Sequence, residues 1–179
     1  MARNDIVKVD GSIDYDYLGK SIDGLSSQMA DIAINAKIFG VKADGITDDT
    51  VALQNAINFL NGSDSSKYTN DYIGGLILLP KGVINLSKII MKSNIIIRGQ
   101  GQKSTRVNPL NSDLKYVFDH TDDLSDTVGN RMAHSSIENL SISPNSDLRG
   151  LPNTQNSSGI NFSHTEMCRL NNIIITDIN

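Results

Sequence analysis

The sequence has no tryptophan and only one cysteine, Cys168, among its 179 residues. A single cysteine excludes an internal disulfide framework and any metal site built from several cysteines, and we expect it to be a small buried apolar residue. The three histidines, His120, His134 and His164, lack metal-ligand spacing such as H-E-x-x-H. The sequence therefore predicts neither a metal nor another cofactor.

Long apolar runs are also missing. No run approaches the roughly 20 residues that span a bilayer, and the N-terminus Met-Ala-Arg-Asn-Asp lacks the apolar region of a signal peptide. The net charge is −4, and lysine and arginine are scattered rather than gathered into a stripe. We therefore expect a soluble protein made in a cytoplasm, with no membrane insertion and no nucleic-acid partner.

Glutamate is rare, because Glu138 and Glu166 are the only two and every other acidic residue is aspartate. This bias, with abundant Asn, Ser and Gly, indicates many turns and few long helices. A chain of this length can hold one small attachment segment and one larger domain. We expect that organisation, with the attachment segment at residues 1–34 and the larger domain at 35–179.

Residues 1–34 contain an apolar seam with spacings that alternate between four and three, formed by Leu18, Ile22, Leu25, Met29 and Ile32. The spacing predicts a helix over about 18–36 with a heptad seam, which we interpret as an oligomerisation contact. The seam covers only about two and a half heptads, and Gly19 and Gly24 lower helix propensity. An ordinary amphipathic helix is therefore the alternative.

A second helix is predicted over about residues 48–60. Residues 46–50, Ile-Thr-Asp-Asp-Thr, supply a capping hydroxyl and two carboxylates for the first turn. Apolar residues then follow at helical spacing, namely Leu53, Ala56, Ile57 and Leu60. Asn61 and Gly62 end the helix.

From Gly74 the sequence consists of short β-branched runs with no room for a helix between them: residues 76–79, 83–84, 89–91, 95–97, 116–118, 137–142, 160–162 and 173–175. Segments 138–142 and 171–175 look like one strand type repeated. Strands too small to bury their own faces predict a solenoid of parallel coils stacked at about 4.8 Å. A β-sandwich is the alternative, although it should show more hairpin turns and a cleaner inside–outside alternation.

Three ordered elements resemble the pectate-lyase-like β-helix superfamily. Residues 35–57 resemble its opening signature, in which Phe-Gly-Ala-Lys-Gly-Asp-Gly-x-Thr-Asp-Asp-Thr precedes a helix, although Val41 and Ala43 depart from that pattern. Gly-Gly-x-Ile-x-x-Pro-x-Gly at 74–82 and Ile-x-Gly-x-Gly at 97–101 also match. The resemblance implies a mainly all-β fold, a right-handed parallel β-helix with an N-terminal helical attachment segment and a capping α-helix.

In that family the helix after the signature closes the end of the coil, which hides a strand edge that could otherwise aggregate. Asp44, Asp48 and Asp49 invite a catalytic reading, but turn and helix-cap roles explain them. Their spacing also does not match the alternate-residue ligands of an EF-hand. We expect Asp48→Ala or Asp49→Ala to lower stability by about 0.5–2 kcal/mol without affecting any activity.

Family members with a short helical segment before the signature resemble phage tailspikes and appendages, which are homotrimers that bind and often cleave host surface polysaccharide. Within the group, the sequence is most similar to the adsorption appendages of small Bacillus-type phages. The resemblance implies a location on the virion, where residues 1–34 would dock on head–tail connector or tail proteins. A free cellular or secreted polysaccharide lyase or glycoside hydrolase of the same superfamily is the alternative.

No catalytic residue is assigned. Glycosidases of this kind use two carboxylates about 5–9.5 Å apart, whereas Glu138 aligns with Asn171 in the apparent repeat and Glu166 has no equivalent place. Aromatic platforms for sugars are scarce, since aromatic residues make up 5% of the chain. We therefore expect the host glycan to bind beyond Asn179, in a longer protein of which these coils are the start.

Overall fold

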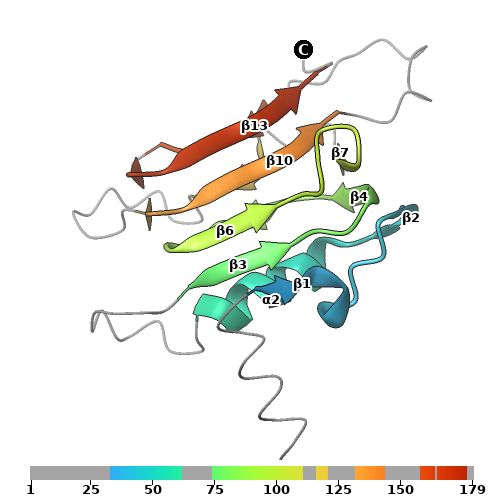
Figure 1. Cartoon of the computed structure of the whole chain (residues 1–179), viewed down its shortest axis with the longest axis horizontal. Coiled ribbons are helices and arrows are strands. Elements are labelled where there is room, and N and C mark those ends of the chain that lie inside the picture. Colours follow the sequence, from blue (N-terminus) through green and yellow to red (C-terminus); the bar gives the residue numbers. More distant parts are fainter. Residues whose placement is uncertain are drawn as a thin grey trace, which may run out of the picture.

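The computed structural model describes residues 33–61, 74–110, 116–120, 132–143, 158–163 and 165–176. These residues form short strands in stacked coils, with one α-helix at one end of the stack (Figure 1). Every strand pair among them is parallel. The helices are η1 (Ala36–Phe39, a 3-10 helix) and α2 (Thr50–Asn61).

The strands, in chain order, are β1 (Ile34–Asn35), β2 (Asp44–Asp48), β3 (Gly75–Leu78), β4 (Gly82–Leu86), β5 (Ile89–Ile90), β6 (Ile95–Arg98), β7 (Thr105–Pro109), β8 (Tyr116–Asp119), β9 (Met132–Ala133), β10 (Ser136–Ile142), β11 (Ser158–Ile160), β12 (Thr165–Glu166) and β13 (Arg169–Ile175).

Most strands line up on three faces of the coil, and β9 and β12 form a separate short pair. The first face runs β1-β3-β6-β10, the second runs β2-β4-β7-β10, and the third runs β5-β8-β11. Strand β10 belongs to two faces, because Ser136, Ile137 and Glu138 pair with β6 while Ser141 and Ile142 pair with β7. Strand β13 stacks on β10 along both halves, so Figure 1 shows β3, β6, β10 and β13 as successive layers.

Strands β10 and β13 bend at the same place. Asn139 and Asn172 both have φ 55°, and asparagine tolerates this left-handed conformation better than most residues do. The Asn172 Nδ2 donates to Asn139 Oδ1 at 2.8 Å, so the two corners are stacked. Register then places Glu138 against Asn171 and Leu140 against Ile173, which confirms the strand repeat predicted from the sequence.

The core lies inside the coils. Strand β6 shows how it is built: Ile95 and Ile97 are fully buried, whereas Ile96 and Arg98 point outward and are half-buried. Neighbouring coils add further buried side chains in register, such as Ile77 from β3 and Ile137 from β10. Each layer of aliphatic side chains stacks on the previous one, and this burial is the main source of stability.

Helix α2 covers the first coil with its apolar stripe. Leu53, Ala56, Ile57 and Leu60 are all buried. The predicted right-handed parallel β-helix with a capping α-helix is thus confirmed. The predicted attachment segment, residues 1–34, lies outside the described part of the chain except for its last two residues, 33 and 34.

Two sequence-based details were wrong. Helix α2 begins at Thr50 rather than near residue 48, and its first turn contains no acidic residue, because Asp48 and Asp49 precede it. The helix predicted over 18–36 also does not extend to residue 36. Ile34–Asn35 form strand β1, and the fully buried Ala36 is the first residue of η1. Tertiary packing overrides the helical spacing at that point.

Candidate functional site

Asp49 organises the opening signature from a buried position. Its carboxylate is 1% exposed and accepts hydrogen bonds from the backbone N–H of Lys42 at 2.8 Å and of Ala43 at 3.0 Å. Its carbonyl oxygen accepts the first helical bond, from Leu53 N at 3.0 Å, and its own N–H donates to Asn85 O at 2.9 Å. Asp49 therefore joins the signature loop, the helix and strand β4 in one network.

The other two signature aspartates stabilise local turns. Asp48 Oδ1 accepts from the backbone N–H of Thr50 at 2.9 Å and from the Thr50 hydroxyl. Asp44 accepts from Ile46 N at 2.9 Å, from Thr47 N at 2.7 Å and from the Thr47 hydroxyl at 2.8 Å. The Thr47 hydroxyl is thus used inside the turn. It therefore does not supply the helix-capping hydroxyl that was expected from residues 46–50. All three aspartates have structural partners, which supports the turn and cap interpretation.

These hydrogen bonds lower the pKa of Asp44 from its ordinary 3.8 to about 2, chiefly through the backbone N–H of Thr47, then that of Ile46, then the Thr47 hydroxyl. A carboxyl whose pKa is depressed by folding adds stability above its unfolded pKa and loses that contribution as the pH falls through the folded value. We therefore expect Asp44→Asn to destabilise the protein more at pH 6 than near pH 2. Urea unfolding of both proteins between pH 6 and pH 2 measures this, and a pH-independent difference would contradict it.

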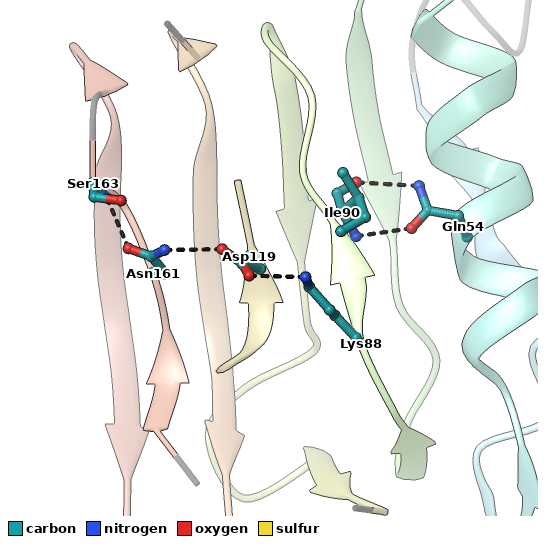
Figure 2. Close-up of polar contacts among 6 residues, drawn as sticks. All are labelled: Gln54, Lys88, Ile90, Asp119, Asn161 and Ser163. Atoms are coloured by element: carbon teal, nitrogen blue, oxygen red, sulfur yellow. Dashed lines mark hydrogen bonds and ion pairs between the residues drawn. The ribbon is translucent and has the colours of Figure 1, made fainter. Parts of the chain in front are cut away.

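Helix α2 also covers the outer edge of a strand at this end of the coil. Strand β5 opens the third face, and its Ile90 N–H donates to Gln54 Oε1 at 2.9 Å while its carbonyl accepts from Gln54 Nε2 at 3.1 Å (Figure 2). The side-chain amide of Gln54 thus pairs with the edge as a preceding strand would. Thr50 adds a second contact, since its hydroxyl accepts from Ser87 N at 2.8 Å. The helix therefore blocks further strand addition at this end.

A polar ladder crosses the third face from coil to coil (Figure 2). The Lys88 ammonium lies 3.1 Å from Asp119 Oδ2, and Asn161 Nδ2 donates to Asp119 Oδ1 at 2.9 Å. Ser163 N then donates to Asn161 Oδ1 at 3.0 Å. Asp119 is only 7% exposed, so a paired cation and amide are what make its burial tolerable. Both its oxygens are occupied, which indicates a structural role.

The first face carries a shallow, open depression of about 200 Å³ on its outer surface, lined by Ile96, His134, Ser135, Ser136, Glu138, Met167 and Arg169. Glu138 is held in place there, because Arg98 Nε donates to its Oε2 at 2.8 Å and the Ser136 hydroxyl donates to its Oε1 at 2.9 Å. Register explains the grouping, since Glu138 lies opposite Arg98 of β6 and Ser136 lies opposite Arg169 of β13.

Such a depression can hold a small polar group. Ile96 and Met167 offer apolar contacts, while Glu138, Ser136 and Arg169 offer acceptors and donors. Its volume lies below the 300–1,000 Å³ of ordinary ligand pockets. Glycosidase chemistry needs a second carboxylate, and no other one lines the depression among the described residues.

Of the residues singled out from the sequence, Glu138 and His134 line this depression. The seam residues Leu18, Ile22, Leu25, Met29 and Ile32 fall outside the described part of the chain, as does His164. Glu166 is exposed on β12, and the register of Glu138 with Asn171 matches the alignment that argued against a carboxylate pair. Cys168 is a free thiol that is half-buried rather than fully buried.

The depression and the network of Gln54 were not found from the sequence. Their residues come from different coils, and only the register brings them together. Among the described residues there is no group of three His, Cys, Asp or Glu side chains that could hold a metal ion. Nor does any helix there have the length and apolar character needed to cross a membrane.

Comparison with known proteins agrees with the signature and the coils. Residues 33–178 match the family described as rhamnogalacturonase A/epimerase, pectate lyase-like. The chain belongs to this family. The matched residues include the Asp49 network, the cap and the described coils.

Solved structures of other proteins share this pectate-lyase-like fold. ORF18 of Geobacillus virus E2 is 26% identical, with a TM-score of 0.68 over 97% of this chain and 29% of its own. PfbA, a surface adhesin of Streptococcus pneumoniae, is 20% identical, with a TM-score of 0.61 over 80% of this chain and 33% of its own. The A-module of the Azotobacter vinelandii mannuronan C-5 epimerase AlgE4 is 16% identical, with a TM-score of 0.55 over 79% and 37%.

The chain therefore spans about a third of the length of these solved relatives. The adhesin and the epimerase, at 20% identity or less, show the fold alone. No curated protein sequence matches the chain significantly.

Proposed function

We propose that this chain is the virion-proximal part of a phage adsorption protein, a tailspike or neck appendage whose full-length β-helix binds and degrades host surface polysaccharide. The likeness to ORF18 of Geobacillus virus E2 carries the proposal. It covers 97% of the chain, whereas the likeness to the adhesin covers 80%. A viral relative that matches nearly the whole chain favours a virion protein over a free enzyme.

The described coils support a structural part in that protein. The cap closes one end of the β-helix, the signature aspartates are committed to turns, and the depression on the first face holds one anchored carboxylate. The family's description names a rhamnogalacturonase and an epimerase, which favours polysaccharide as the ligand of the full-length protein. Bond cleavage, where present, belongs to coils beyond Asn179.

The proposed protein is a homotrimer joined at its N-terminus, with Leu18, Ile22, Leu25, Met29 and Ile32 of the three copies facing one another. Residues 1–34 connect it to head–tail connector or tail proteins. A seam of about two and a half heptads is marginal alone, so side-by-side packing of coils or a virion socket supplies most of the association energy.

Two charges placed in the seam test this proposal. We expect Leu25→Lys with Ile32→Lys to weaken assembly of the trimer at its N-terminus and to lower spike occupancy on particles, because the seam would bury unpaired ammonium groups. Light scattering gives the mass, and quantitative immunoblotting of purified particles gives the occupancy. Ser27→Lys with Ala30→Lys adds the same charges at outward heptad positions. This control should leave the mass of the protein and its occupancy on particles unchanged. A monomeric wild type, or normal incorporation of the seam variant, would refute the proposal.

A further inference from the structure

The capping end of the β-helix presents an apolar surface to solvent. Three of its side chains are strongly exposed, namely Ile38 at 66%, Val51 at 71% and Phe59 at 59%. Phe39 joins them, since its ring lies 5.4 Å from that of Phe59 at an interplanar angle of 54°. We call these four residues the cap patch. They come from η1 and from the outward side of α2, opposite its buried stripe.

The composition of the helix is unusual for a surface element. The exposed side of an amphipathic helix normally carries charged residues, which keep it soluble and prevent association. Helix α2 has no charged residue in its twelve positions, and its other exposed side chains are the neutral Asn55 and Asn58. The outward sides of two such helices could therefore meet without charge repulsion, and the nearest charge in η1 is the exposed Lys37. Exposed aromatic and aliphatic side chains that are grouped in this way mark interaction sites.

The position of the patch indicates which partner covers it. Ile38 follows the last seam residue, Ile32, by six residues, and six residues span at most about 20 Å even when extended. Seams that meet on a three-fold axis would therefore hold the three caps close to that axis. Ile38 and Phe39 follow the seam closely in the chain, and the Phe59 ring lies against that of Phe39, so a neighbouring copy is the surface most available to the patch.

We propose that the cap patch is a contact between copies, in which Phe59 and Val51 of each copy pack against the caps of its neighbours around the three-fold axis. This inference rests on the proposed trimer. The new element is that the capping helix of the β-helix supplies apolar contact area that the short seam lacks. The cap then has two faces with separate roles: the buried stripe closes the coil and the outward side joins the copies.

Cross-linking tests the contact in the full chain. Cys168→Ser removes the native thiol, and Phe59→Cys then places one thiol per chain in the patch. On oxidation we expect disulfide-linked pairs to be the main product on a non-reducing gel. Lys103→Cys in the same background places a thiol on an exposed turn away from the cap and should give few pairs. Light scattering of each protein is measured alongside.

Charge substitution gives an independent readout. Val51→Glu with Phe59→Glu should raise the concentration at which the trimer dissociates by about tenfold or more, because hot-spot contacts are lost and like charges meet. Its circular dichroism under dissociating conditions should be unchanged, since both residues are exposed, and its melting temperature should fall only slightly, because the Phe39–Phe59 ring contact is lost. Lys103→Glu should alter neither.

The outcomes separate the two proposals. A trimer that forms Phe59→Cys pairs and dissociates on charging supports the cap contact. A trimer that forms no such pairs and tolerates the glutamates overturns it, while the proposed trimer stands. A monomeric wild type overturns both. In that case increased binding of a hydrophobic dye by the Leu25→Lys, Ile32→Lys variant would mean that the seam of the same chain covers the patch.

Discussion

Replacing Asp49 by alanine is expected to lower the free energy of unfolding by about 2–4 kcal/mol. The carboxylate is buried and satisfies two backbone N–H groups, those of Lys42 and Ala43, which would remain without a partner in the variant. An unsatisfied buried donor costs about 1–3 kcal/mol, and hydrogen bonds to a charged group are the stronger ones. This loss exceeds the 0.5–2 kcal/mol expected from the sequence, because the side chain bridges a loop instead of capping the helix.

Urea unfolding at pH 7 measures the difference. Asp48→Ala is the matched control, because Asp48 is exposed and its carboxylate bonds only to Thr50, two residues along the chain, so about 0.5–1.5 kcal/mol is expected. Equal losses in the two variants would show that Asp49 does not organise the signature loop. Both variants of the full-length protein should retain any activity toward polysaccharide when folded, and a folded Asp49 variant without it would show a catalytic role.

The second large effect is expected at Gly82, the last residue of the Gly-Gly-x-Ile-x-x-Pro-x-Gly element. Its φ is +123°, and a Cβ built there would lie 2.1 Å from the backbone oxygen of Ala43. Gly82→Ala should therefore combine backbone strain of about 1–3 kcal/mol with a steric clash of similar size. We expect a loss of about 3 kcal/mol or more, or failure to fold at 37 °C, as measured by thermal unfolding.

Gly101→Ala separates the two causes. Gly101 has a similar φ of +134°, but the nearest atom to a Cβ there is Ser104 Oγ at 3.7 Å, an ordinary contact. It should show the strain alone, about 1–3 kcal/mol. A Gly101 variant as damaged as the Gly82 variant would mean that the close approach of the first two coils is not what requires glycine at position 82.

The strands that were predicted from the sequence share a common composition. Strands β3, β6 and β10 are runs of β-branched and aliphatic residues whose inward side chains fill the core, so their composition marks them. Strands β2 and β7 were missed because they lack it. The one aliphatic residue of β2, Ile46, is 87% exposed, and β7 has a single buried aliphatic side chain, Val107, beside an arginine and a proline. These strands form because stacking on β4 satisfies their backbone groups.

Site residues were harder to predict than strands. The aspartates of the signature could be given turn and cap roles because their partners lie within seven residues. Gln54 could not be predicted, since it bonds to the backbone of Ile90, 36 residues away. The ladder of Lys88, Asp119 and Asn161 likewise depends on coils of unequal length. A sequence fixes local hydrogen bonds, but the register between coils decides which distant side chains meet.

The central claim is that these coils begin a spike attached to a virion, with their cap toward the particle. Immunoelectron microscopy of purified particles, with antibodies raised against the folded chain, tests it most directly. The account predicts labelling at the tail or neck, and close to the particle surface rather than at the far end of the spike. Particles without label, in a preparation where the infected cells contain the protein, would contradict it.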